Sequence, residues 1–230
     1  MGHFIIHLKD TDDPTVYLQR AAEIIIEGGI LVYPTDTVYG IGADPLNINA
    51  IHRLFTIKQR DIHRGVPILV PDLEDAMKIG SFAPIEQKLV EFFWPGSLTL
   101  VVPLSTLDSS HIRLSTLITG GTDQIAIRIP HNPIILGICK ALKELRGFGG
   151  IIGTSANFSG QPNIVSGKRV VEEFSNTVDF LIDTGECKEK TASTVIRIDH
   201  SQTDIKESLI ILREGSITKA QILNKLRKIK

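Results

Sequence analysis

Cysteine is scarce in this chain of 230 residues, which contains only two. Cys139 and Cys187 lie far apart in the sequence, so they match neither the close pairs of a zinc site nor a disulfide framework. Such sparse cysteine usage favours a reducing compartment. We therefore expect a cytoplasmic protein.

Long hydrophobic runs are also lacking. The N-terminus offers only the apolar run 4–6, far short of a signal peptide or a membrane span, and Ile6 breaks the myristoylation pattern that Gly2 opens. The 25 basic and 26 acidic residues nearly cancel, to a net charge of −1. We expect no targeting or membrane-anchoring segment, and any nucleic-acid contact must come from a local basic patch.

The standard nucleotide loops and metal motifs are missing as well. Gly40 and Gly42 are followed by Pro45 where a dinucleotide fingerprint needs its third glycine, and Gly167-Lys168 has Pro162 where a Walker loop needs its first. The seven histidines form no HExxH pattern. The sequence therefore predicts no resident metal.

The composition, 42% hydrophobic and 22% charged, is that of a globular chain. Strand and helix periods alternate without a linker or repeat, which predicts one α/β domain over residues 1–230. A first helix is expected to have Asp13 as its cap, Pro14 at its first position and Gly28-Gly29 at its end. The other predicted helices are 47–58, 85–93, 133–145 and 217–229, and the strands are 4–8, 30–33, 66–70, 97–102, 124–129, 151–152, 178–182, 194–198 and 209–212.

A basic cluster follows the second predicted helix, where Arg53, Lys58, Arg60 and Arg64 are opposed only by Asp61. A charge run is usually a solvated face, but the helical period places Lys58 on the apolar side. Burying an ammonium group is costly unless an anion, from a ligand or from the protein, accepts it. Phosphate suits a set of arginine and lysine side chains with neutral donors beside them.

Two further positions carry polar groups at strand ends. Arg128 alternates with Ile125 and Ile127, so it faces away from the isoleucines. Ser155 nearly matches the nucleophile elbow G-x-S-x-G, but Asn157 replaces the second glycine and a turn follows where the elbow needs a helix. We prefer Ser155 as a hydrogen-bond donor, and a self-satisfied Ser/Asn turn is the alternative.

Seven segments taken together resemble the motifs of the YrdC-like family, in the same order and over residues 24–215. They are YPTDTVYG at 33–40, KQR at 58–60, WPGSLT at 94–99, RIP at 128–130, TSANFSG at 154–160, STV at 193–195 and LREG at 212–215. The resemblance implies a single α/β domain, with a twisted mixed β-sheet and flanking helices around an open basic cavity.

By the same resemblance, the chain is expected to be a nucleotidyltransferase, an L-threonylcarbamoyladenylate synthase. Such an enzyme joins L-threonine, bicarbonate and ATP, releases pyrophosphate, and supplies the t6A modification of tRNA. Carbamate attack on phosphorus needs positioning and charge stabilisation but no serine or cysteine nucleophile. Mg²⁺ would arrive bound to ATP. Contact with tRNA or with proteins of a t6A-transfer complex is left open.

The resemblance also implies the roles of individual residues. The threonine-binding positions are Thr35, Arg128 and Ser193, with Arg128 as the partner of the carboxylate. The ATP-binding positions are Lys58, Arg60, Arg64, Ser155, Asn157, Asn163 and Arg213, and Lys58 and Arg60 are also the catalytic candidates. Turn chemistry is the alternative for Thr35 and Ser193, and a surface salt bridge is the alternative for Arg128.

Three positions depart from the family pattern. Asp61 stands where proline usually follows the Lys-x-Arg motif, Gly65 loosens a loop that proline would stiffen, and Leu69 replaces a common histidine. These changes affect the affinity or the choice of substrate. The extra C-terminal domain of longer relatives is expected to be absent.

Two other functions stay open at this stage. An RNA-binding module would use the 53–64 patch and the basic tail formed by Lys225, Arg227, Lys228 and Lys230. Trp94 and Tyr39 could form a base-stacking platform for it, although core aromatics are the commoner explanation. A paralogous enzyme of the same fold would act on another carbamoyl substrate.

Overall fold

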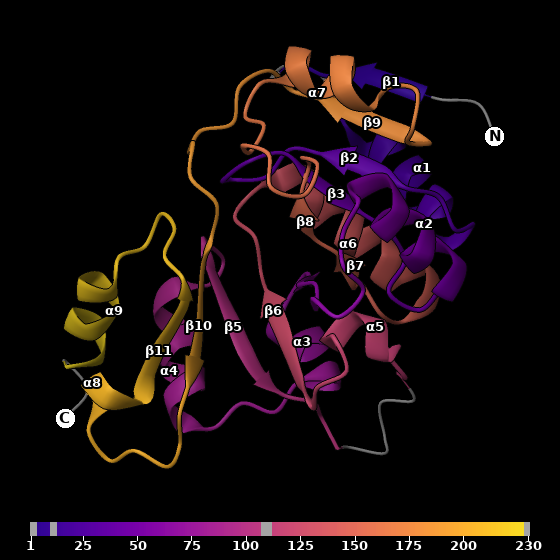
Figure 1. The fold of residues 1–230 in the computed structure, drawn as a ribbon. Helices are drawn as coiled ribbons and strands as arrows, with labels where there is room; N and C mark the ends of the chain where they lie inside the picture. Colours follow the sequence, from indigo (N-terminus) through magenta and orange to yellow (C-terminus); the bar gives the residue numbers. More distant parts are fainter. Residues whose placement is uncertain (1–3, 10–12, 107–111, 228–230) are drawn as a thin grey trace.

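The strands form two mixed sheets in the computed structural model, which describes residues 4–9, 13–106 and 112–227. The first sheet has the order β1 (Phe4–His7), β9 (Phe180–Asp183), β2 (Leu31–Tyr33), β3 (Gly40–Gly42) and β8 (Thr154–Ser155). The second has the order β11 (Leu209–Arg213), β10 (Thr194–Ile198), β5 (Leu98–Pro103), β6 (Gln124–Arg128), β4 (Ile68–Leu69) and β7 (Ile151–Ile152). Figure 1 places the first sheet above the second.

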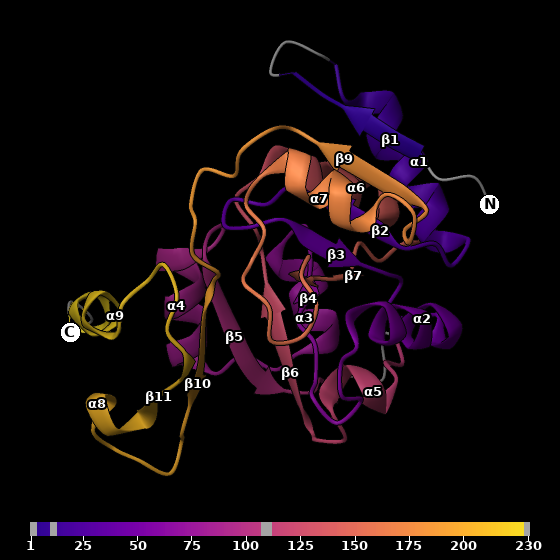
Figure 2. The same ribbon diagram turned by 45° about the horizontal axis from the view of Figure 1, so that its top comes forward.

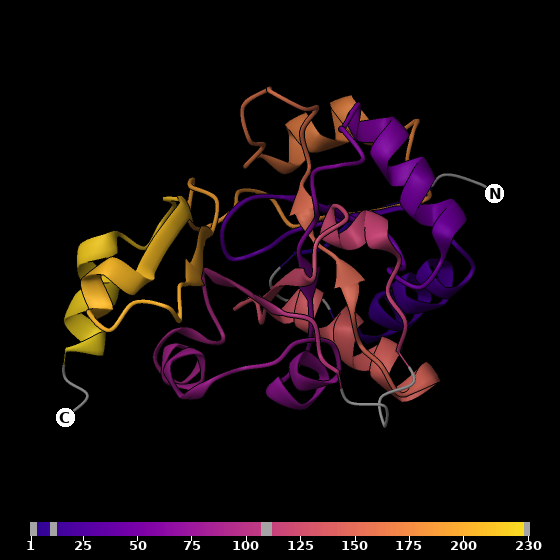
Figure 3. The same cartoon turned by 60° about the horizontal axis from the view of Figure 1, so that its bottom comes forward.

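Helices cover both sheets (Figures 1 and 2). They are α1 (Thr15–Ile26), α2 (Ile48–Lys58), α3 (Leu73–Ile79), α4 (Pro84–Phe93), α5 (Thr116–Thr119), α6 (Pro133–Arg146), α7 (Gly167–Phe174), α8 (Ile205–Ser208) and α9 (Lys219–Leu226). Buried residues of α1 and α6 pack with β2 and β9 in one core, and a larger core joins α2, α4 and α9 to the strands β5 and β6. Figure 3 shows α9 and β11 on the side of the molecule away from the N-terminus. None of the described helices is long and apolar enough to cross a membrane.

Helix α2 has clear signals at both ends. The Asn47 side chain caps its start by accepting from the backbone N–H groups of Asn49 and Ala50. Its end is the left-handed residue Gln59, whose φ is 50°. Ile51 and Leu54 are buried along one face, and Lys58 in the last turn is only 3% exposed. The predicted burial of Lys58 is confirmed.

Strand β6 separates the core from a cavity. Ile125 and Ile127 belong to the core, whereas Gln124, Ala126 and Arg128 line the cavity. Because successive side chains of a strand point to opposite faces, one strand supplies both walls. The predicted orientation of Arg128 is confirmed.

The two sheets meet at Gly42 and Ile152. The Ile152 N–H donates to the carbonyl of Ala43 over 3.0 Å, and its carbonyl accepts from the Tyr33 hydroxyl over 3.1 Å. A Cβ at Gly42 would collide with that same carbonyl, so this crossing requires glycine. The chain then passes from β7 of one sheet to β8 of the other through a single residue, Gly153.

The predicted α/β class is confirmed, but the strands are divided between two sheets where the sequence predicted one. Most predicted elements are present with shifted ends, and the strands at 151–152 and 194–198 match. Helix α1 begins at Thr15, not Pro14, although Asp13 does accept from the Thr15 N–H. The last helix spans Lys219–Leu226, and residues 228–229 of its predicted range lie outside the described residues. Elements β3, β8, α3, α5, α7 and α8 were not predicted.

Candidate active site

A cavity of about 360 Å³ lies where the two sheets meet. Its walls come from the β2–β3 loop, the α2–β4 loop, strands β5 and β6, the β7–β8 crossing and the segment that leads into β10. Seven of the ten predicted site residues line it: Thr35, Arg60, Arg64, Arg128, Ser155, Ser193 and Arg213. Four of these are arginines, and no aspartate or glutamate is found among the described lining residues. The lining therefore suits an anionic ligand.

Arg128 is the most constrained of the four arginines. Its Nε donates to the carbonyl of Gly96 over 2.8 Å, its Nη1 donates to the Thr37 hydroxyl over 3.3 Å, and its Nη2 pairs with the carboxylate of Asp36. The Arg128 side chain is only 6% exposed. The surface salt bridge considered from sequence is therefore wrong, because the ion pair is buried at the edge of the cavity.

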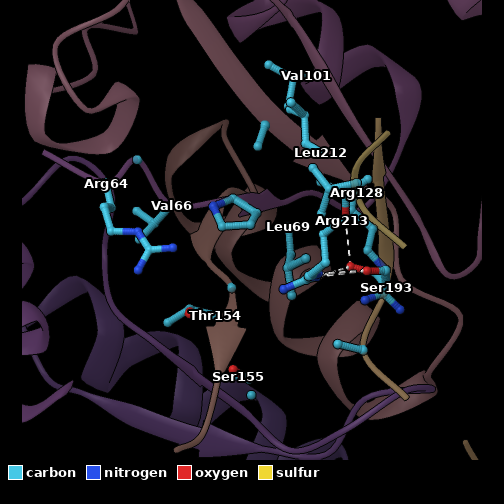
Figure 4. Close-up of a pocket in the computed structure, with 18 of the residues that line it drawn as sticks. Arg64, Val66, Leu69, Val101, Arg128, Thr154, Ser155, Ser193, Leu212 and Arg213 are labelled. Carbon is cyan, nitrogen blue, oxygen red and sulfur yellow. Dashed lines mark hydrogen bonds between the residues drawn. The ribbon is translucent and has the colours of Figure 1, made fainter. Parts of the chain in front are cut away.

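Arg213 and Ser193 form a second polar group beside Arg128 (Figure 4). Arg213 donates to the Ser193 carbonyl over 2.8 Å and to the Ser193 hydroxyl over 3.0 Å. The hydroxyl of Thr99 lies 3.0 Å from that of Ser193. Burial and the neighbouring Arg128 guanidinium lower the pKa of Arg213. Since like charges repel, an anion between the two arginines would relieve this strain.

Thr35 closes the turn that follows strand β2. Its hydroxyl donates to the Val38 carbonyl over 2.7 Å and accepts from the N–H groups of Thr37 and Val38. The turn chemistry considered as an alternative is therefore present. It coexists with a place in the cavity wall, because Thr35 is also a lining residue.

Arg60 and Arg64 line the cavity from the α2–β4 loop. Figure 4 shows Arg64 on the opposite side of Leu69 from Arg128 and Arg213. Arg60 donates to the carbonyls of Arg64, at 3.2 Å, and Gly65, at 2.7 Å. Burial, and then the guanidinium groups of Arg64 and Arg213, lower the pKa of Arg60. The arginines thus form two groups with an apolar side chain between them.

Lys58 lies behind this wall and is not among the lining residues. Its Nζ donates to two backbone carbonyls, those of Ser155 and Asn157, the latter over 2.7 Å. These acceptors are sufficient to explain why Lys58 is buried. The buried charge therefore does not require a bound anion. Burial first, and the charge of Arg60 second, lower the pKa of Lys58 to about 7.

The loop after strand β8 holds the other predicted residues. The Ser155 hydroxyl donates to the Asn157 side-chain oxygen, so the Ser/Asn turn considered as the alternative is present. Asn157 is buried, and its amide donates to the carbonyls of Phe158 and Gln161, so it shapes the loop behind Ser155. Asn163 is exposed and does not line the cavity.

Sequence reasoning missed several polar residues of this region, and four of them lie in the quoted segments. Thr37, Thr99 and Thr154 line the cavity, and Asp36 pairs with Arg128 from just behind the lining. All four stand inside quoted segments, so position in a motif was the available signal. The contacts of Asp36 and Thr37 with Arg128 cross from one sheet to the other, which local sequence patterns do not encode.

The aromatic platform considered for RNA binding is not formed. Tyr39 is fully buried and Trp94 is 9% exposed, with its ring N–H donating to the Leu98 carbonyl. Arg53 is paired with Asp179, away from the cavity lining. Of the predicted basic tail, Lys228 and Lys230 lie outside the described residues. The described residues contain no group of three or more histidine, cysteine, aspartate or glutamate side chains that could hold a metal ion.

Comparison with known proteins identifies the family. Residues 23–215 match the family model of Sua5, YciO and YrdC proteins, which carries the description telomere recombination. The chain belongs to the Sua5/YciO/YrdC family. Curated relatives named threonylcarbamoyl-AMP synthase are 34% identical in Pyrococcus abyssi, over 89% of this chain, and 31% identical in Bacillus subtilis, over 92% of it. The chain spans about half the length of these two relatives, 56% of each.

A shorter member of the family extends this comparison. The threonylcarbamoyl-AMP synthase of Idiomarina loihiensis is 32% identical, with 71% of this chain matched to 84% of the relative. Among solved structures, P. abyssi Sua5 complexed with L-threonine superposes with a TM-score of 0.82 at 32% identity, covering 99% of this chain and 62% of that one. E. coli YciO shares the fold, with a TM-score of 0.78 at 22% identity over 95% of this chain and 98% of its own.

Proposed function

We propose that this member of the family is an L-threonylcarbamoyladenylate synthase. One observation carries the proposal: the Sua5 that was solved with L-threonine has this fold, and this chain buries Thr35, Arg128 and Ser193 in the wall of its cavity. A guanidinium beside two hydroxyl groups matches the carboxylate and hydroxyl of a small hydroxy amino acid.

The proposed reaction has two steps. The amine of L-threonine combines with bicarbonate to give a carbamate and water. A carbamate oxygen then attacks the α-phosphorus of ATP, the bond to the bridging oxygen breaks, and pyrophosphate leaves with the electron pair. No covalent enzyme intermediate is needed, so positioned donors and positive charge are sufficient catalysts.

We assign Arg128 to threonine and the other three arginines of the cavity to the nucleotide. Arg128, Ser193 and Thr35 bind threonine, with Arg128 on its carboxylate. The nucleotide phosphates lie toward Arg60, Arg64 and Arg213, which have the planar donors that phosphate prefers. The Ser155 hydroxyl turns its single proton from the Asn157 oxygen to the nucleotide. Lys58 and Asn157 hold the end of strand β8 and the loop that follows it, and Asn163 contacts the nucleotide from farther along that loop. Lys58 and Arg60 are the proposed catalytic cations.

The remaining assignments follow from this chemistry. Mg²⁺ would enter with ATP, held by triphosphate oxygens and water, which fits a described lining without carboxylate side chains. Both cysteines are free and buried, which supports a cytoplasmic site for the reaction. The product is passed to the machinery that forms t6A on tRNA, through contacts that the cavity itself does not define.

The test is an omission experiment. We expect pyrophosphate release from ATP to require both L-threonine and bicarbonate, and the product to be threonylcarbamoyl-AMP by mass spectrometry. L-Serine and other amino acids, each replacing threonine, test for a paralogous enzyme. Pyrophosphate release at equal speed without threonine would contradict the proposal, and a strong preference for another amino acid would assign the chain to a different carbamoyl substrate.

A further inference from the structure

Asp36 and Arg128 form an ion pair that joins the two sheets at the cavity. Asp36 comes from the loop between β2 and β3 of the first sheet, and Arg128 ends strand β6 of the second. Their side chains are only 11% and 6% exposed, respectively. Arg128 lines the cavity but Asp36 does not, so the carboxylate holds the guanidinium from behind.

Asp36 is itself held in place. Its second oxygen lies 3.2 Å from the hydroxyl of Ser97, and its backbone carbonyl accepts from the N–H of Glu189 over 3.3 Å. The same Ser97 hydroxyl lies 3.1 Å from the carboxylate of Glu189. A hydroxyl has one proton, so it can donate to only one of these two carboxylates at a time. Arg128 therefore sets the orientation of Asp36, and Ser97 contributes when its proton is directed to Asp36 and not to Glu189.

The contacts of Arg128 determine what it can still bind. Its guanidinium has five N–H groups, of which three are directed to Gly96, Thr37 and Asp36. One N–H remains on each terminal nitrogen, which is the number that a two-bond fork onto a carboxylate requires. Asp36 and Thr37 come from the β2–β3 loop of the first sheet and Gly96 lies just before β5 of the second, so the orientation of this fork depends on how the sheets meet.

We propose that Asp36 is a positioning residue that aims Arg128 at the carboxylate of the amino-acid substrate. The inference rests on the proposed function, because it presumes that threonine binds here. Asp36 acts through Arg128 and does not touch the substrate. It fixes one edge of the guanidinium. The two remaining N–H groups of Arg128 then keep the geometry that a two-bond contact with a carboxylate requires. Without it, Arg128 keeps its charge but loses its orientation.

The experiment compares two ligands that differ at the carboxylate. L-Threonine and L-threoninamide are titrated calorimetrically into the wild-type protein and into Asp36→Ala. We expect the wild type to prefer threonine, and the substitution to weaken threonine binding about tenfold while changing threoninamide binding little. The preference for the acid over the amide therefore falls. In steady state, the KM for threonine rises about tenfold and the KM for ATP stays within about twofold.

A matched control separates positioning from the loss of a buried ion pair. Asp44 and Arg146 form a similar pair at 2.7 Å, with side-chain exposures of 8% and 16%, and neither lines the cavity. Asp44→Ala should lower the melting temperature but leave the preference for threonine over threoninamide unchanged. Asp36→Asn keeps an acceptor for Arg128 and a donor for Ser97, so it should restore most of the preference that Asp36→Ala loses.

Other outcomes would overturn the inference. If Asp36→Ala keeps the wild-type ratio of the two affinities, or weakens both ligands equally, Asp36 does not position Arg128. If Asp36→Ala does not fold, Asp36→Ser, whose side chain is polar but shorter and uncharged, decides by the same ratio: a decrease of at least about twofold supports positioning, and an unchanged ratio contradicts it. A wild-type protein that binds neither ligand contradicts the proposed function instead, so the two failures are distinguishable.

Discussion

Lys58 has as many acceptors as a neutral amine has N–H groups. An uncharged lysine carries two N–H donors, and the carbonyls of Ser155 and Asn157 accept two hydrogen bonds. Its ammonium form has a third N–H and a positive charge, which an anion in the cavity would stabilise through the intervening wall. Burial lowers the pKa of Lys58 to about 7, so the two forms exchange near neutral pH. Anion binding would favour the charged form.

This pKa leads to a prediction about stability. Between pH 7 and the ordinary lysine value of 10.5, the unfolded chain holds a proton on Lys58 that the folded chain has lost. Since stability rises with pH wherever the unfolded state binds more protons, the cost of burying the charged lysine is complete below pH 7 and fades above it. The unfolding free energy of the wild type minus that of Lys58→Met should therefore increase from pH 7 to pH 10. Urea unfolding at several pH values measures this difference, and a flat difference would contradict it.

Arg128→Lys tests whether the Arg128 guanidinium makes a two-bond contact with the threonine carboxylate. Lysine keeps the positive charge but lacks the planar pair of donors, so the KM for threonine should rise about tenfold to a hundredfold, equivalent to about 1.5 to 3 kcal/mol. The KM for ATP should change much less. Initial rates with each substrate varied in turn measure both constants. Equal shifts in both, or a shift in neither, would remove Arg128 from the threonine site.

Side-chain direction could be predicted at two of these positions because it depends on local period alone. Lys58 is buried because it lies one and two turns from apolar residues of α2, and Arg128 faces the cavity because it alternates with isoleucines of β6. The partners could not be predicted. Asp36 reaches Arg128 and Ser97 only because the two sheets meet there, and no period in the sequence indicates that meeting.

At the scale of an element, the end of α2 contains a strained residue. Gln59 has a φ of 50°, a left-handed conformation that glycine adopts without steric cost. Gln59→Gly should therefore stabilise the protein by about 0.5 to 1 kcal/mol. The same substitution inside α1, Gln19→Gly, should destabilise it by about 1 kcal/mol, because glycine is a poor helix residue. Chemical denaturation of both variants measures the effect, and a loss of stability with Gln59→Gly would contradict it.

Elements in which apolar residues recur at a regular spacing were predictable from the sequence, and elements without such a regular spacing were not. The stripe of α2 and the alternation of β6 extend over enough residues to specify their type. The two-residue strand β8 and the glycine-rich strand β3 have no period to detect, yet they pair with each other and carry Ser155 to the cavity. The division into two sheets was missed for the same reason, since it occurs at these short strands.

At the scale of the whole molecule, the junction of the sheets depends on one small residue. A Cβ at Gly42 would meet the backbone carbonyl of Ile152, which cannot rotate aside. Gly42→Ala should therefore destabilise the protein by about 1 to 3 kcal/mol. Gly137→Ala in α6 meets only the end of the flexible Leu18 side chain and gains helix propensity, so it should remain within about 1 kcal/mol of the wild type. Thermal unfolding of Gly42→Ala and Gly137→Ala measures the loss of stability in each. Equal losses would contradict the inference that the junction of the sheets requires glycine at position 42.

The cluster of arginines in the cavity makes the empty molecule sensitive to its ionic surroundings. Arg60 is repelled by Arg64 and Arg213, and Arg213 is repelled by Arg128, so the folded state holds like charges that the unfolded chain keeps apart. Simple salts should therefore raise the melting temperature of the unliganded protein by screening this repulsion. Pyrophosphate should raise it further at equal ionic strength, because it binds the folded chain alone. Once the cavity holds an anion, added salt should lose most of this effect, so the slope of melting temperature against ionic strength becomes a measure of occupancy.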